Sequence, residues 1–134
     1  MLYLTGTFYP LLTRATYPAL GFPQYPGEVG SSDADADDAM KAKAQKDAED
    51  AIAEPLDVYR AFFLYGKQFI GGDTPSIADF RLAATLEFLR AIDYEFPAWA
   101  EEYMSRMETT LGEAYSEPAA DVRGYIEYVR SQSE

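Results

Sequence analysis

Apolar side chains recur every three or four residues along most of this chain, which is the spacing of one face of an α-helix. The strict alternation of apolar and polar residues that is typical of a half-buried strand does not occur. Helices are therefore predicted over residues 1–17, 38–66, 76–92, 98–111 and 118–131. With 134 residues, the chain is long enough to bury a core, so we expect one all-α domain over residues 1–134, a helical bundle of about five helices.

Proline and glycine mark where these helices bend, begin or end. Pro10 and Pro55 lie inside the first two helices. Because proline has no amide donor and its ring clashes with the preceding turn, we expect a kink at each. Gly66 is a stop signal for the second helix, and Pro97 favours the start of the fourth.

Residues 18–38 are expected to form a loop, because proline and glycine punctuate their first half and the second half is polar and acidic. The alternation of Asp with Ala in the second half lacks the glycine and the terminal glutamate spacing of a calcium-binding loop, so we expect no metal there. Four aspartates suit the first turn of the next helix, where negative charge is favoured: Asp33, Asp35, Asp37 and Asp38.

The helix over 76–92 has the clearest start signal in the chain. Ser76 stands three residues before Asp79, as in a capping box, in which each side chain binds the backbone amide of the other residue. Pro75 and Phe80 occupy the positions of a hydrophobic staple. Apolar residues cover most of the surface of this helix, which predicts a central place in the bundle. The pair of Ser76 and Asp79 is therefore interpreted as structural and not as a catalytic dyad.

The composition excludes several kinds of chemistry. The chain has no Cys and no His. It therefore has no disulfide, no thiolate nucleophile, no Ser-His-Asp triad and no Cys- or His-ligated metal. Any reaction at this chain would depend on carboxylates, Tyr or Lys. No pattern of basic neighbours singles out one of the 11 tyrosines as an activated group.

The net charge and the hydropathy of the chain limit the kinds of partner that it can bind. The net charge of −12 disfavours nucleic acid and anionic membranes, because phosphate groups are bound by Lys and Arg. No apolar run approaches the ~18 residues of a membrane span, and no signal peptide pattern opens the chain. A cytoplasmic location is expected, without nucleic acid or membrane as partner.

The segment before the third helix resembles a family motif. Phe69–Asp79 is similar to the F-[LI]-x-G-D-x-x-[ST]-x-A-D segment of cytosolic glutathione transferases, the capping box of the core helix in their C-terminal domain. Two further stretches resemble helices of the same domain: Leu4–Pro10 with Tyr17 and Pro18, and Phe96 with Pro97, Trp99 and Tyr103. The resemblance covers nearly the whole chain.

The resemblance implies a division of roles. Family members hold glutathione and the catalytic Tyr, Ser or Cys in an N-terminal thioredoxin-like domain, and no βαβ pattern for such a domain is present. No catalytic residue is therefore expected here, and no cofactor in this chain, with glutathione implied for a full-length parent. Substrate-binding roles are implied for Thr5, Tyr9 and Leu12, since that region lines the co-substrate pocket in the family. A stripe at this spacing is also typical of core residues.

Two functions stay open, besides a plain bundle of unknown role. The chain could be the helical half of a glutathione transferase, inactive in conjugation by itself, whose first helix begins at Met1 without a cap. It could also be a stand-alone interaction module of the kind found in translation elongation factor gamma subunits. In either case we expect a partner, which is a thioredoxin-like domain or a second copy in a homodimer. The residues expected to face it are Tyr3, Phe8 and Tyr17.

Overall fold

The computed structural model describes residues 1–22 and 37–134, and the regular elements within them are all helices. The predicted all-α class is therefore confirmed. The described residues form no strand, only a single bridge between Phe69 and Gly72. The elements in chain order are η1 (Leu4–Phe8), α1 (Tyr9–Thr16), η2 (Pro18–Leu20), α2 (Asp38–Ala51), α3 (Ala53–Val58), η4 (Tyr59–Leu64), α4 (Ile77–Leu89), η5 (Arg90–Ile92), α5 (Ala98–Leu111) and α6 (Glu113–Ser133).

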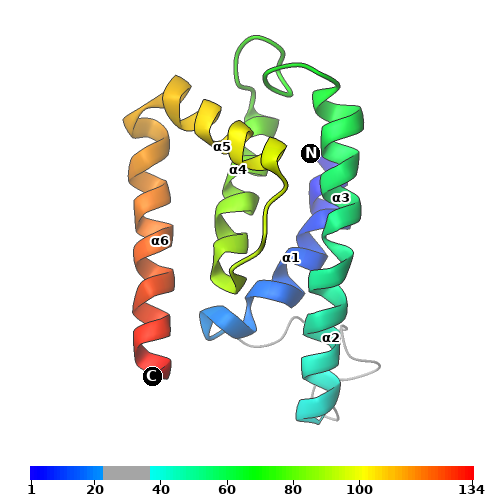
Figure 1. Cartoon of the computed structure of the whole chain (residues 1–134), viewed down its shortest axis with the longest axis vertical. Coiled ribbons are helices and arrows are strands. Elements are labelled where there is room, and N and C mark those ends of the chain that lie inside the picture. The colour runs from blue at the N-terminus through cyan, green and yellow to red at the C-terminus, as the bar shows by residue number, and fades with distance from the viewer. Residues whose placement is uncertain (23–36) are drawn as a thin grey trace.

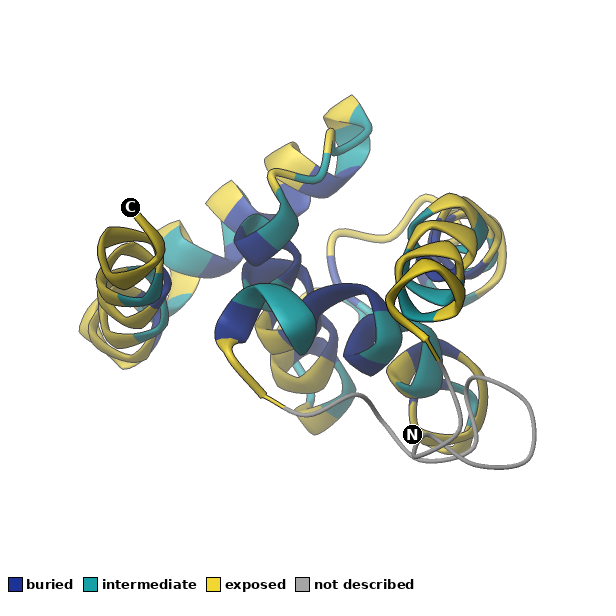
Figure 2. Ribbon diagram, turned by 90° about the horizontal axis from the view of Figure 1, so that it is seen from below, coloured by how far each residue is buried: buried dark blue, intermediate teal, exposed yellow. Residues whose placement is uncertain are grey.

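Helix α4 lies in the middle of the arrangement, as its apolar sequence predicted (Figure 1). It contacts α1, α5 and α6, and α1 packs in turn against α2. Helices α2 and α3 continue one another along one edge of the molecule, and α6 runs along the opposite edge (Figure 1). Seen from below, the buried stretches of the ribbons face one another across the centre, and exposed residues form the outer sides (Figure 2).

The regular α-helix is interrupted just before each of the two interior prolines. Before Pro10 the chain forms the wide π-helical turn of η1, in which the Tyr9 amide donates to the Leu4 carbonyl. Because Pro10 has no amide to offer the preceding turn, regular α-helix begins only at Tyr9. Pro55 likewise cannot donate to Ala51, and the long second helix is divided at Ile52 into α2 and α3.

Two predicted helix ends are shifted. The second helix ends at Leu64, two residues before Gly66, because Tyr65 itself adopts a left-handed conformation with φ of 44°. The last helix begins at Glu113 and not at residue 118, so Pro118 lies inside it. The first turn of α6 forms before the proline, since the amides of Tyr115 and Ser116 both donate to the Gly112 carbonyl. Helix α5 has the predicted bounds.

The expected loop over residues 18–38 is partly helical. Residues Pro18–Leu20 form η2, and Asp37 is the N-cap of α2, with its carboxylate accepting the Met40 amide at 2.8 Å. The expectation that an aspartate begins this helix is therefore confirmed for Asp37. Asp33 and Asp35 lie outside the described residues.

The core surrounds α4 but does not cover it completely. Ile77 and Phe80 are 70% and 45% exposed, so the apolar surface of this helix is not buried all round. Its buried face includes two carboxylates, Asp79 and Glu87, which a count of apolar positions does not reveal. The largest fully buried apolar side chains elsewhere come from the first helix, η2, the junction of α2 and α3, α3, the turn before α4, and α5: Phe8, Leu20, Ile52, Leu56, Phe69, Tyr103 and Met107.

Candidate functional site

A groove between the first helix and α4 contains all three residues that the sequence suggested for substrate binding. Its cavity measures about 320 Å³, which is within the range of small-molecule pockets. Thr5, Tyr9 and Leu12 form part of one wall. The complete lining is Leu4, Thr5, Tyr9, Leu12, Arg81, Ala84, Thr85 and Phe88.

The hydrogen bonds of the groove are largely internal. The Thr5 hydroxyl donates to the Met1 carbonyl at 2.8 Å, and the Thr85 hydroxyl donates to the Arg81 carbonyl at 2.9 Å. The hydroxyl oxygens of Tyr9 and Tyr17 lie 3.2 Å apart and share one hydrogen bond. The groove is thus an apolar channel with a few hydroxyl groups and one guanidinium group.

The second wall of the groove was missed by sequence reasoning. Arg81, Ala84, Thr85 and Phe88 follow the spacing i, i+3, i+4 and i+7, so they share one stripe of α4. The sequence did contain a sign of this wall, because apolar residues occur around most of this helix. That excess predicts a second, outward apolar face, but nothing in the spacing shows that the face meets the first helix.

The first-helix aromatic residues are less available than expected. Phe8 is completely buried and packs against Tyr59 with ring centroids 5.9 Å apart, so the prediction that it faces a partner is wrong. Tyr3 is half-buried and packs edge-on against the same Tyr59 ring at 5.7 Å. Both side chains therefore face η4, to which Tyr59 belongs. Phe62 of η4, whose ring lies edge-on to that of Phe63, is 75% exposed.

Asp79 is the centre of the capping segment. A capping box links it with Ser76, and its side chain is fully buried. The carboxylate accepts the backbone amides of Ile70 at 2.7 Å, Gly71 at 3.0 Å and Ser76 at 2.8 Å. It also accepts the hydroxyls of Ser76 at 2.9 Å and Tyr103 at 2.8 Å.

These five donors explain the ionisation of Asp79. Burial by itself would raise the pKa of the carboxyl group, but the hydrogen bonds from Ser76, Ile70, Tyr103 and Gly71 outweigh burial and lower the pKa. For Tyr103, burial and its bond to the carboxylate both raise the pKa of the phenol. Because every contact of Asp79 joins parts of the fold, the arrangement is that of a structural cap and not of a catalytic dyad.

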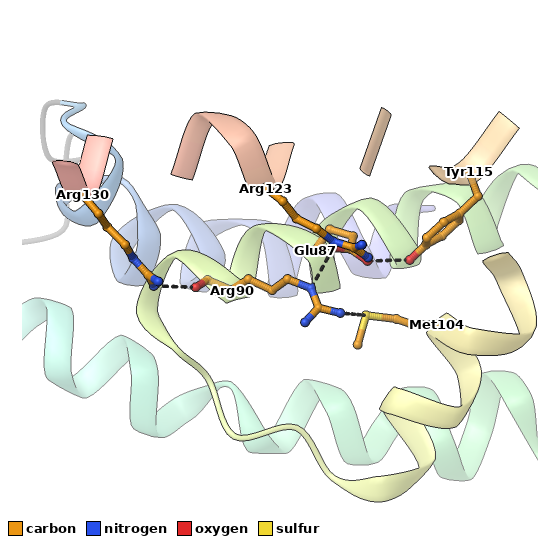
Figure 3. A network of polar contacts seen from close by, with 6 residues as sticks. All are labelled: Glu87, Arg90, Met104, Tyr115, Arg123 and Arg130. Atoms are coloured by element: carbon orange, nitrogen blue, oxygen red, sulfur yellow. Dashed lines mark hydrogen bonds and ion pairs between the residues drawn. The ribbon is translucent and has the colours of Figure 1, made fainter. Parts of the chain in front are cut away.

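Glu87 forms a second buried network, two turns further along α4 (Figure 3). Glu87 is 3% exposed, and its carboxylate accepts Arg90 Nε at 2.7 Å, Arg123 Nη2 at 2.9 Å and the Tyr115 hydroxyl at 2.8 Å. Burial would raise the pKa of this carboxyl group, but the bonds from Arg123, Arg90 and Tyr115 lower it overall. The network ties α6 to α4, because Tyr115 and Arg123 belong to α6.

A cavity of about 370 Å³ beside this network has three arginines in its lining, Arg90, Arg123 and Arg130. Each of them is already paired: the first two with Glu87, and Arg130 with Asp93 at 2.9 Å. The cavity is therefore a less suitable binding site for an anion than its arginines suggest. No group of three potential metal-ligating side chains occurs among the described residues.

A family comparison covers the middle of the chain. Residues 42–107 match the model of the family "Glutathione S-transferase, C-terminal domain". Over these residues, the chain belongs to the glutathione S-transferase C-terminal domain family. The matched residues include the capping segment and the α4 wall of the groove, whereas η1, α1 and α6 lie outside them.

The resemblance carried by Phe69–Asp79 is thus confirmed for this part of the glutathione S-transferase C-terminal domain. Neither the curated proteins nor the solved structures include a match to the chain. Within residues 1–22 and 37–134, no helix has the length and apolar character needed to cross a membrane.

Proposed function

We propose that this chain is the helical domain of a glutathione transferase-like protein and that its groove forms one wall of the pocket for a hydrophobic co-substrate. The observation that carries the proposal is the meeting of Thr5, Tyr9 and Leu12 with the α4 stripe in one groove. Membership of the C-terminal domain family over residues 42–107 supports it. The chain has no cysteine and needs no oxidising compartment, so the cytoplasm is the proposed location.

The residues of the groove fit a hydrophobic acceptor better than they fit glutathione. Glutathione carries two carboxylates and an ammonium group, whereas Arg81 is the one charged side chain in the lining. We therefore assign glutathione and the activation of its thiol to a thioredoxin-like part of a full-length parent. There the thiolate would attack the electrophile, which this groove would hold and shield from water.

Binding of a neutral aromatic molecule tests the groove directly. We expect 4-phenylbutyramide to shift the NMR amide signals of the groove residues, and Tyr9→Ala to weaken binding roughly tenfold because an aromatic contact is lost. Tyr128→Ala is the matched control, since Tyr128 is an exposed tyrosine on α6, away from the groove. Shifts located elsewhere, or equal losses in both variants, would contradict the assignment.

A conjugation assay tests the division of labour between the two domains. We expect no turnover when the chain is mixed with glutathione and an aryl halide electrophile, because Arg81 alone cannot hold the two carboxylates and the ammonium group of glutathione. Measurable turnover above the uncatalysed rate would show that the chain contains its own thiol-activating group, and the proposal would then be wrong.

Exposed aromatic residues favour one second candidate, a protein interaction module that forms a homodimer. Phe62 is largely exposed and its ring lies 5.3 Å from that of Phe63, which contacts Tyr3 in turn. Light scattering after size-exclusion chromatography tests this function. We expect a dimer that Phe62→Ser converts to a monomer, with Tyr128→Ser as control. A chain that is monomeric at all concentrations would contradict it.

A further inference from the structure

The groove has a single charged side chain, and its charge is opposite to that of the protein as a whole. The chain has a net charge of −12, yet Arg81 lines the groove and no carboxylate does. The other seven lining residues are apolar or carry hydroxyl groups. An anion that enters this groove therefore meets one positive group and no negative one.

Arg81 is also unpaired. The guanidinium groups of Arg60, Arg90, Arg123 and Arg130 each have a carboxylate partner. That of Arg106 donates to a backbone carbonyl. By contrast, no ion pair or hydrogen bond joins the Arg81 side chain to another residue within the described part of the chain. Its five N–H donors are all available to a ligand.

The two threonine hydroxyl groups of the groove leave the binding of an anion to other side chains. The protons of Thr5 and Thr85 are already donated to carbonyls of their own helices. These two hydroxyls can accept hydrogen bonds from a ligand but have no proton left to stabilise an anion. Among the groove's side chains, only Arg81 and the Tyr9 hydroxyl have donors for an anionic group, and the fork of an arginine matches a carboxylate in geometry.

The spacing along α4 sets the shape of the ligand. Arg81 and Phe88 are seven residues apart on one stripe, which corresponds to roughly 10 Å along the helix axis. Ala84 and Thr85 lie between them, and Leu4 and Leu12 provide apolar surface from the other wall. A ligand that reaches both ends would place its charge at Arg81 and its apolar body toward Phe88.

We propose that the groove selects an amphipathic carboxylate, an aromatic or aliphatic acid about as long as two helical turns, and that Arg81 is the residue that recognises its charge. This inference rests on the proposed function, since it names the class of co-substrate for the same groove. It makes Arg81 a specificity-determining residue, while Tyr9, Leu12 and Phe88 bind the apolar part.

The test compares an acid with its neutral isostere by calorimetric titration of the whole chain. We expect 4-phenylbutyrate to bind about tenfold more tightly than 4-phenylbutyramide, as a charge-assisted hydrogen bond would give. Arg81→Met keeps a long side chain and removes the charge, so the two compounds should then bind equally. Arg81→Lys should restore part of the difference, because the charge returns without the fork.

Lys41→Met is the matched control, since it removes one positive charge on α2, outside the groove. It should leave the preference for the acid unchanged. Equal binding of acid and amide to the unmodified chain, or a preference that survives Arg81→Met, would overturn the inference and leave the proposed groove intact. If neither compound binds, the proposed function fails and the inference fails with it.

Discussion

Helix α4 buries two carboxylates in two different ways. Asp79, in its first turn, is held by uncharged donors, most of which belong to residues 70–76. Glu87, two turns later, is held by two arginines and a tyrosine, and two of these three partners come from α6. The first arrangement lies mostly within one short segment, with Tyr103 of α5 as its distant partner, and the second depends mainly on segments that are distant in sequence.

The contrast shows that a buried carboxylate can serve either a local or a long-range purpose. Asp79 fixes the start of α4 and the turn before it, because its oxygens accept the N-cap amide of Ser76 and the amides of Ile70 and Gly71 in that turn. Glu87 fixes where α6 lies on α4. Burying an ionised carboxylate is unfavourable unless hydrogen bonds or charges compensate, so each site depends on its full set of partners.

Removing Asp79 should have the largest effect. Asp79→Ala leaves the amides of Ile70 and Gly71 without their acceptor, and the Tyr103 hydroxyl keeps only the backbone carbonyl of residue 79 at 3.3 Å; each lost acceptor costs about 1–3 kcal/mol. We expect the free energy of unfolding to fall by about 3–5 kcal/mol, measured by urea denaturation. The loss should be global, because Tyr103 links this site to α5. A loss below about 1 kcal/mol would place the site among dispensable surface caps.

Removing Glu87 should cost less and act more locally. Arg90 and Arg123 are each about two-fifths exposed, 39% and 40%, so they can turn to water after Glu87→Ala. The Tyr115 hydroxyl loses its acceptor, and we expect a loss of about 2 kcal/mol. In hydrogen exchange, the amides of α6 should exchange faster while those of α2 do not change. Uniform acceleration throughout the chain would remove the distinction between the two sites.

The same contrast explains what the sequence could predict. The capping box was predicted because Ser76 and Asp79 are three residues apart and obey a local rule. The contacts of Glu87 were not predicted, since Arg123 lies 36 residues away and no spacing rule joins them. Thr5, Tyr9 and Leu12 could be grouped by helical period, but their meeting with Arg81 depends on how two helices pack. The start of α6 at Glu113, five residues before the predicted one, was missed, and Pro118 lies inside the helix.

Acid should weaken both sites in one pH range. The folded-state pKa values of Asp79 and Glu87 lie below the ordinary values of 3.8 and 4.5. A depressed pKa contributes stability that is fully present above the ordinary value and is lost as the pH falls through the folded value. We expect urea denaturation between pH 7 and pH 3 to show stability falling below about pH 4.5.

Variants separate the two contributions to this acid loss. Glu87→Gln should flatten the part of the profile that begins near the ordinary glutamate value, while the part due to Asp79 persists. If the free energy of unfolding of Glu87→Gln depended on pH as that of the unmodified chain does, Glu87 would not contribute to acid sensitivity.

The smallest expected effect comes from Ser76, and it tests whether the cap acts as one unit. Ser76→Ala removes the hydroxyl that donates to Asp79 at 2.9 Å but keeps the backbone amide that donates to the same oxygen at 2.8 Å. We expect a loss of about 1 kcal/mol in the free energy of unfolding, typical of an N-cap. Because the hydroxyl acts through the carboxylate, the double variant with Asp79→Ala should lose little more than Asp79→Ala alone. Full additivity in urea denaturation would show that Ser76 stabilises the start of α4 independently of Asp79.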